Sequence, residues 1–230
     1  MTYRLHYAPD NASLIIRMVL LEMKVPFDVT LVDRRQNAQN SPNYRMLNPN
    51  GLIPVLETPS GPIFETGAIL LWLSETHGQM APQSGSPERA NFLKWLFFNS
   101  NTLHAGLRML FYPEKYAGPA ATDPLRNQMQ SALRDHLKTL DGLAAQKPEW
   151  FGGEHPSVLD VYICACLRWM AIYPKGQTMW FTLTDYPALA DLAARLQTRP
   201  SALITAQAEG LGLTIFTNPT YCSPPEGSPT

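Results

Sequence analysis

Cysteine is scarce in this sequence: its 230 residues contain only Cys164, Cys166 and Cys222. An odd number without framework spacing does not fit a secreted fold that is held together by disulfides. Cys164 and Cys166 are two positions apart, so on a helix they would point in different directions and could neither pair nor share a metal. We expect both to fill space in an apolar helix, and we expect no metal site.

Long apolar runs and excess charge are also missing. No run approaches the ~20 residues that span a bilayer, and the first residues lack the apolar core and cleavage site of a signal peptide. A net charge of -1 creates no global field that would attract nucleic acid or an anionic membrane. These absences favour a cytoplasmic protein whose partners include neither nucleic acid nor a membrane.

The hydrophobic and aromatic content is that of a folded protein. Hydrophobic residues make up 45% of the chain and aromatic residues 10%, which argues against disorder. A chain of this length folds as one or two domains with a sizeable core.

The first third of the chain predicts alternating short strands and helices. We expect strands at residues 3–7, 27–32, 52–58 and 62–64, and helices at 13–23 and 66–77. The polar residues 33–43 predict a loop with one helical turn. The predicted order is therefore β-α-β-(α)-β-β-α, and it defines a first domain at residues 1–78.

The rest of the chain predicts helices only. Residues 79–87 are rich in Pro, Ser and Gly and predict a linker. Helices are expected at residues 88–112, 124–146, 159–172 and 188–198, within a helical domain at residues 88–212. Residues 213–230 predict an irregular tail with prolines at 219, 224, 225 and 229, and Leu213, Ile215 and Phe216 are its candidates for packing against the domain.

One helix start is well marked. Ser157 and Asp160 have the S-x-x-D spacing of an N-terminal cap, after Gly152, Gly153 and Pro156 and before an apolar helix. We interpret the pair as structural, with about 1 kcal/mol resting on the cap.

Residues 48–56, Asn-Pro-Asn-Gly-Leu-Ile-Pro-Val-Leu, resemble the N-P-x-G-x-[VI]-P-x-L segment of the glutathione S-transferase family. In that family the second proline has a cis peptide bond, and the residue before it pairs its backbone with the cysteinyl part of glutathione. The resemblance therefore implies that Ile53 and Pro54 bind glutathione. Without it, Pro54 would be an ordinary trans proline on an edge strand.

Two further features fit the same family. Glu65 and Thr66 resemble its [E/Q]-[S/T] pair, where a helix N-terminus binds the γ-glutamyl carboxylate of glutathione and the acid binds the ammonium group. In isolation the pair would only cap the helix and favour its dipole. Arg34 lies in the loop where the family often has a cation for the glycine carboxylate.

The resemblance covers residues 3–210. It implies a thioredoxin-like N-terminal domain, an all-helical C-terminal domain and a homodimer. Residues 5–14, Leu-His-Tyr-Ala-Pro-Asp-Asn-Ala-Ser-Leu, resemble the L-Y-Y-S-P-x-x-C-S-L opening of bacterial Beta-like members. The cysteine of that opening forms a mixed disulfide with glutathione, but Ala12 stands in its place here. Because thiol-transferase chemistry needs a protein thiolate, we do not expect that activity.

Three polar residues remain where the thiol of glutathione would lie. Tyr7, Asn11 and Ser13 occupy a strand end and the first turn of the following helix. A thiolate there would gain from the helix dipole and from a hydroxyl or amide donor. We favour Ser13, then Asn11, then Tyr7, while helix capping is the alternative role for Ser13 and Asn11.

The helical half supplies candidates for an electrophile pocket. Trp95 to His104 resemble the family's W-L-x-x-x-x-x-x-L-H helix, whose histidine lies near the active site. His104 is thus a pocket residue or a satisfied core histidine, and its role as acid, base or donor stays open. Phe111 and Tyr112 suit an apolar or aromatic electrophile, and Arg108 could hold an anionic co-substrate.

The main functional hypothesis is a glutathione transferase, with glutathione as co-substrate and a small electrophile as the second substrate. The protein would contribute proximity, orientation and thiolate stabilisation. Conjugation, isomerisation, dehalogenation and ether cleavage share this first step and stay open. The alternatives are a regulatory glutathione-binding protein without turnover, which Ala12 motivates, and a docking module like those attached to translation factors.

Overall fold

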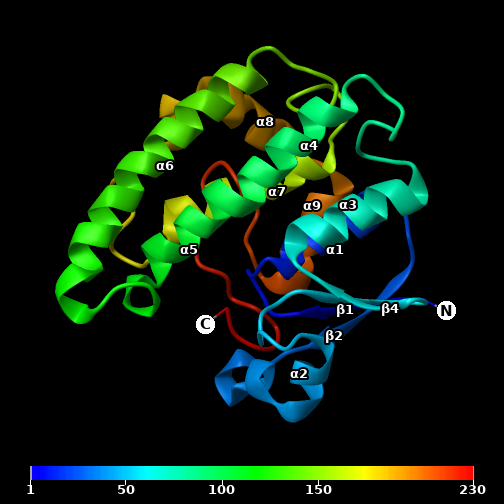
Figure 1. The fold of residues 1–230 in the computed structure, drawn as a ribbon, viewed down its shortest axis with the longest axis horizontal. Coiled ribbons are helices and arrows are strands. Elements are labelled where there is room, and N and C mark those ends of the chain that lie inside the picture. The colour runs from blue at the N-terminus through cyan, green and yellow to red at the C-terminus, as the bar shows by residue number, and fades with distance from the viewer. Residues whose placement is uncertain (1, 230) are drawn as a thin grey trace.

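The computed structural model describes residues 2–229, and its N-terminal part is built on a mixed sheet (Figure 1). The strands are β1 (Tyr3–Tyr7), β2 (Phe27–Leu31), β3 (Val55–Thr58) and β4 (Gly61–Phe64), in the order β2-β1-β3-β4. β1 and β2 are parallel, whereas β3 runs antiparallel to both β1 and β4. Leu5 pairs with Leu56 across β1 and β3, and both side chains are fully buried.

Helices cover both faces of this sheet. α1 (Ser13–Glu22) and α3 (Thr66–His77) lie on one face and α2 (Pro42–Leu47) on the other (Figure 1). Every residue from position 13 to position 20 of α1 is buried, because the sheet, α7 and α9 surround this helix. The thioredoxin-like domain predicted from the sequence is therefore confirmed.

The polar segment after β2 contains more helix than predicted. Two 3-10 turns, η1 (Arg34–Gln36) and η2 (Ala38–Asn40), precede α2. Ser41 begins α2, since its hydroxyl accepts a hydrogen bond from the backbone N–H of Tyr44. The expected strand at residues 52–58 begins only at Val55, which leaves Leu52 and Ile53 in an open loop.

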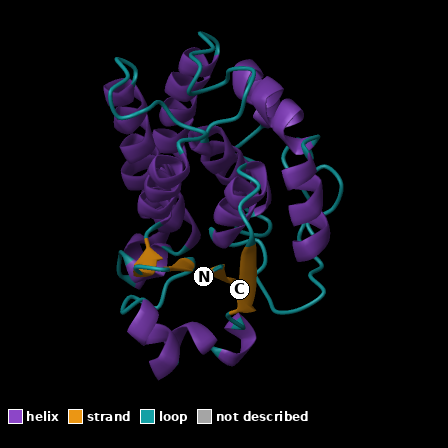
Figure 2. Cartoon of the chain, turned by 90° about the vertical axis from the view of Figure 1, so that its right-hand side faces the viewer, coloured by secondary structure: helices purple, strands orange, loops and turns teal. Residues whose placement is uncertain are grey.

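The C-terminal part is helical, as predicted, and it packs on the α1 and α3 side of the sheet (Figure 2). Its α-helices are α4 (Arg89–Phe98), α5 (Ala105–Phe111), α6 (Thr122–Ala144), α7 (Val158–Ile172), α8 (Pro187–Gln197) and α9 (Pro200–Glu209). A π-helical segment, η3 (Asn99–His104), joins α4 to α5, so the helix predicted at residues 88–112 is continuous but locally widened. Short 3-10 turns are η4 (Pro113–Lys115), η5 (Pro119–Ala121) and η6 (Leu183–Asp185).

α9 was not predicted as a separate helix. Arg199 has an extended backbone, with φ -72° and ψ 147°, because the residue before a proline avoids the helical region. Pro200 then occupies the first position of α9, where its missing N–H costs nothing.

α7 is the central helix of the second domain and begins at the predicted cap. Ser157 accepts hydrogen bonds from the N–H groups of Leu159 and Asp160, and the Asp160 carboxylate accepts from the N–H groups of Ser157 and Gly152. Burial raises the pKa of Asp160 to about 6. Further along α7, Cys164 and Cys166 are fully buried, which confirms them as apolar fillers.

The tail, residues 210–229, runs from the helical domain back to the sheet and contains neither helix nor strand (Figure 1). Ile215 and Phe216 are buried as expected, but Leu213 is 88% exposed, so its expected packing was wrong. Gly227 lies against Leu31 with φ +72°, and an added Cβ would meet Leu31 Cδ1 at 2.7 Å. The positive φ favours glycine at this approach to β2, and a side chain would also crowd Leu31.

Within residues 2–229, no helix combines the length and the apolar character needed to cross a membrane.

Candidate functional site

A cleft of about 1090 Å³ lies between the two domains. The sheet domain contributes the end of the β1–α1 loop, the loop before β3 and the start of α3. The helical domain contributes α4, η3, α5 and α7, and the tail adds a third side. Every predicted glutathione-binding and electrophile-pocket residue lines this cleft: Arg34, Ile53, Pro54, Glu65, Thr66, His104, Arg108, Phe111 and Tyr112.

The loop before β3 presents free backbone groups to the cleft. The Ile53–Pro54 peptide bond is cis, as the resemblance implied. Within residues 2–229, the backbone N–H and C=O of Ile53 have no hydrogen-bond partner. Side chains hold the preceding residue instead, since Asn48 Nδ2 and the Tyr44 hydroxyl donate to Leu52 O at 2.9 and 2.7 Å. Ile53 is thus fixed and available to pair with an extended ligand.

The start of α3 supplies both signs of charge. Thr66 is its first residue, so the helix directs unpaired N–H groups and a positive dipole end into the cleft. Glu65 lies just before it with φ +71° and has no ion-pair partner in the described part of the chain. This arrangement suits a ligand group that carries a carboxylate beside an ammonium.

Asn11 and Arg34 lie together at the N-terminal end of α1. Arg34 Nη1 donates to Asn11 Oδ1 at 2.9 Å and to Pro229 O at 2.7 Å. Asn11 Nδ2 donates to Pro9 O and Pro229 O, both at 3.0 Å. Arg34 therefore fixes which way the Asn11 amide faces, with its NH₂ group as the donor.

The structure does not bring Ser13 or Tyr7 to the cleft. Ser13 is fully buried, and its hydroxyl exchanges hydrogen bonds with the backbone of Ala8, at 3.1 Å to the C=O and 3.3 Å from the N–H. The Tyr7 hydroxyl donates to Glu226 of the tail, and burial together with this hydrogen bond raises the pKa of Tyr7. Of the three thiolate candidates, only Asn11 lines the cleft.

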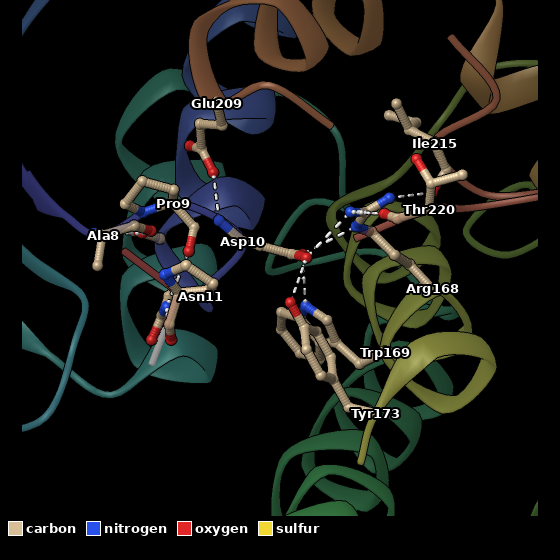
Figure 3. Close-up of polar contacts among 12 residues, drawn as sticks. Ala8, Pro9, Asp10, Asn11, Arg168, Trp169, Tyr173, Glu209, Ile215 and Thr220 are labelled. Atoms are coloured by element: carbon tan, nitrogen blue, oxygen red, sulfur yellow. Dashed lines mark hydrogen bonds and ion pairs between the residues drawn. The ribbon is translucent and has the colours of Figure 1, made fainter. Parts of the chain in front are cut away.

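Asp10 is the centre of a buried polar network that the sequence did not reveal (Figure 3). Its carboxylate accepts two hydrogen bonds from Arg168, at 2.8 and 2.9 Å, one from Trp169 Nε1 at 3.1 Å and one from the Tyr173 hydroxyl at 2.9 Å. Its backbone N–H donates to Glu209 at 2.9 Å. No local signal links residues so far apart in the chain, because only the packing of α7 and α9 against α1 brings them together.

The network fixes the backbone next to Asn11. Asp10 has φ +52°, a left-handed conformation that costs a non-glycine residue energy unless its surroundings hold it. Glu209 also accepts from Arg17 at 2.9 Å, and its deep burial nevertheless raises its pKa to about 7. The α1 loop is thus held from the helical domain on two sides.

His104 faces the cleft from η3 as a neutral side chain. Its Nδ1 lies 2.8 Å from the Tyr162 hydroxyl, and its ring lies 5.4 Å from the Trp169 ring. Burial, with the charge of Arg108 as a second cause, lowers the pKa of His104 to about 4. It can therefore donate or accept a hydrogen bond at neutral pH but carries no charge there.

The tail lines the cleft with Tyr221, Cys222 and Pro229, none of which the sequence predicted. Burial, followed by the charge of Asp10, raises the pKa of Cys222 to about 11. This thiol is thus protonated at neutral pH and does not replace the cysteine that is missing at Ala12. Within residues 2–229, no group of three or more His, Cys, Asp or Glu side chains is placed to hold a metal ion.

A thioredoxin-like domain and an all-helical domain that share one ligand cleft define a two-domain class of protein. Comparison of the sequence with models of known protein families identifies the family. The model for the glutathione S-transferase N-terminal domain matches residues 12–76, and the model for the C-terminal domain matches residues 123–195. The chain belongs to the glutathione S-transferase family.

Individual relatives are similar to this chain over nearly its whole length. The disulfide-bond oxidoreductase YfcG of Escherichia coli K12 is 28% identical over 213 residues, which are 88% of this chain and 95% of YfcG. A sphingomonad glutathione S-transferase solved with glutathione is 28% identical, with a TM-score of 0.74 over 91% of this chain and 100% of its own. A Burkholderia graminis glutathione transferase with two glutathione molecules per subunit is 25% identical, with a TM-score of 0.77 over 92% and 90%.

Proposed function

We propose that this protein binds glutathione in the interdomain cleft and activates its thiol for attack on a small electrophile. One observation carries the proposal. The free backbone of Ile53, the start of α3 with Glu65, and the Asn11–Arg34 pair all face the same cleft. These are the groups that a γ-glutamyl end, an extended cysteinyl backbone, a thiol and a glycine carboxylate require.

Glutathione binding follows from these groups one at a time. The γ-glutamyl carboxylate lies at the N-terminus of α3, and its ammonium group pairs with Glu65. The cysteinyl N–H and C=O pair with the Ile53 backbone as an added strand. Arg34 is the cation for the glycine carboxylate.

Asn11 is our choice as the thiolate donor in place of Ser13. The Ser13 hydroxyl is already used within the loop, whereas Asn11 Nδ2 faces the cleft and gives one hydrogen to Pro229 O. The thiolate takes the place of that carbonyl. Lowering a thiol pKa by two units needs about 2.7 kcal/mol, which one charge-assisted hydrogen bond and the α1 dipole can supply.

The electrophile then lies on the helical wall, near His104, Phe111 and Tyr112. The protein accelerates the reaction by holding the thiolate and the electrophile together in one cleft. The homodimer and the cytoplasmic location expected from the sequence remain predictions.

Disulfide reduction is a second candidate, which the size of the cleft favours. A volume of about 1090 Å³ exceeds what one tripeptide fills, the B. graminis relative holds two glutathione molecules, and YfcG is named an oxidoreductase. One glutathione thiolate would attack a disulfide, break its S–S bond and form a mixed disulfide with release of the first thiolate. The second glutathione thiolate would attack the mixed disulfide at the glutathione sulfur, which forms glutathione disulfide and releases the second thiolate. Formation of glutathione disulfide from a small dialkyl disulfide, measured with glutathione reductase, tests this route.

The test of the main proposal is a glutathione titration between pH 5 and 9, followed by thiolate absorbance. We expect a saturable signal below pH 8, and Asn11→Ala should raise the pKa of the bound thiol by about one unit. Ser13→Ala is the matched control and should leave that pKa unchanged. Calorimetric binding without thiolate would support a regulatory glutathione-binding protein, and absence of binding would overturn the proposal.

A further inference from the structure

Besides Arg34, three cations line the cleft: Arg108, Lys115 and Lys175. None of them has a carboxylate partner within residues 2–229. Each lies against a tyrosine instead: Arg108 Nε donates to Tyr116 at 2.7 Å, Lys115 Nζ lies 4.4 Å from the Tyr112 ring centre, and Lys175 Nζ lies 5.4 Å from that of Tyr221. Three positive charges thus line the cleft, and no carboxylate of the described residues pairs with them.

The acids of the cleft are already used. Among the described residues that line it, only Asp10 and Glu65 are acidic. Arg168 neutralises Asp10 through its two hydrogen bonds, and Glu65 is assigned to the ammonium group of glutathione. In the proposed binding mode glutathione does not compensate the three cations either, since its two carboxylates lie at α3 and Arg34.

Aromatic rings line the same cleft. Phe111 and Tyr173 have ring centres 6.3 Å apart, and Tyr173 and Tyr221 lie 5.7 Å apart, both in edge-to-face geometry. The rings come from α5, from the end of α7 and from the tail. A planar ring can pack among them, and Arg108 lies three residues before Phe111 on α5, on the same side of that helix.

We propose that the second substrate is a small aromatic electrophile that carries a carboxylate or sulfonate. Arg108 binds the anion, because a guanidinium matches a planar carboxylate with two parallel hydrogen bonds. Lys115 and Lys175 add electrostatic attraction for the anion within the same cleft. The inference rests on the proposed function. In a substitution reaction the thiolate forms a C–S bond at the ring carbon that bears a halogen, and the halide leaves with the C–halogen electron pair.

The test compares two acceptors whose reacting carbon lies between two ortho nitro groups and whose charge differs: neutral 2-chloro-1,3-dinitrobenzene and anionic 4-chloro-3,5-dinitrobenzoate. Each kcat/KM is divided by the rate constant with free glutathione at the same pH. We expect the wild-type protein to favour the anion, and we expect Arg108→Gln to lower the anion-to-neutral ratio about tenfold. Arg108→Lys should restore part of the ratio, and added salt should lower it.

Lys138→Gln is the matched control, because Lys138 is an exposed cation on α6 that does not line the cleft. It should leave the ratio unchanged. An Arg108→Gln ratio equal to that of wild type would overturn the inference even if both rates fell together.

The proposed function fails separately, through the absence of a glutathione thiolate signal. If thiolate forms but neither acceptor reacts, the affinities for 3,5-dinitrobenzoate and 1,3-dinitrobenzene are measured by calorimetry. They test whether the cleft prefers the anionic ligand over the neutral one. Preference for the benzoate that Arg108→Gln abolishes supports the inference, and equal affinities overturn it.

Discussion

At the residue scale, His104 shows how the cleft sets the chemistry of one side chain. Its ring is held between the Tyr162 hydroxyl and the Trp169 indole, and Arg108 lies nearby. Burial and a neighbouring positive charge both oppose protonation. The sequence left acid, base and donor roles open, and the lowered pKa makes His104 a neutral hydrogen-bonding group at pH 7.

We predict a pH-dependent stability difference between the wild-type protein and His104→Gln. Between pH 4 and 6.5 the unfolded chain binds more protons at His104 than the folded protein does, so this contribution rises with pH and is lost as pH falls through about 4. The difference in free energy of unfolding should grow by about 1 to 2 kcal/mol across this range, less than the full shift because part of the ring faces the solvent-filled cleft.

Urea unfolding of both proteins at half-unit pH steps measures this difference. The comparison is needed because Asp160 and Glu209 have raised pKa values and act in the opposite direction over the same range. A difference that stays constant from pH 4 to 7 would contradict the prediction.

At the element scale, α7 depends on its first turn. The helix is buried along nearly its whole length and connects the helical domain to α1 and α3. Without the Ser157 hydroxyl, the backbone N–H groups of Leu159 and Asp160 would be buried with no hydrogen-bond acceptor. The cap therefore determines where the central helix begins as well as how stable it is.

We predict that Ser157→Ala lowers the free energy of unfolding by about 1 to 2 kcal/mol, because two buried N–H groups lose their acceptor. Ser41→Ala, at the half-buried start of α2, is the comparison and should cost less than 1 kcal/mol. Chemical denaturation measures both values. Equal losses for the two variants would show that burial of the α7 cap adds nothing.

At the scale of the whole molecule, Arg168 joins three parts of the chain. It pairs with Asp10 in the sheet domain, lies on α7 and donates to the tail at Ile215 O and Thr220 O. Asp10 and Arg168 are almost completely buried, so each charge relies on the other. The same ion pair thus holds the α1 loop beside Asn11 and the tail beside the cleft.

We predict that Arg168→Met destabilises the protein by about 3 to 5 kcal/mol, because it leaves the Asp10 carboxylate buried without a counter-charge. The double variant Asp10→Asn, Arg168→Met should recover part of this loss. Arg126→Met, which removes an ion pair with exposed Asp123, is the control and should cost about 1 kcal/mol or less.

Denaturant unfolding gives these energies, and hydrogen exchange in residues 215–229 reports the release of the tail. The double variant distinguishes a missing counter-charge from simple loss of packing. A double variant as unstable as Arg168→Met alone would show that the charge of Asp10 is not the cause.

The sequence alone determined the order of strands and helices in the first domain and the presence of a helical second domain. Helical and strand periodicities are local, and so is the cap at Ser157. Each is set by residues a few positions apart. The family resemblance added the cis turn at Ile53 and Pro54 and the expected roles of Glu65, Thr66 and Arg34, and the structure places all five residues on the same cleft.

Only the tertiary structure decided which polar groups face that cleft. The sequence favoured Ser13 over Asn11, but the hydroxyl of Ser13 turns into the loop while the amide of Asn11 is held by Arg34. The Asp10–Arg168 pair and the course of the tail depend on residues up to 219 positions apart, such as Tyr7 and Glu226. Contacts of that range leave no local pattern, because they exist only after the helices have packed around the sheet.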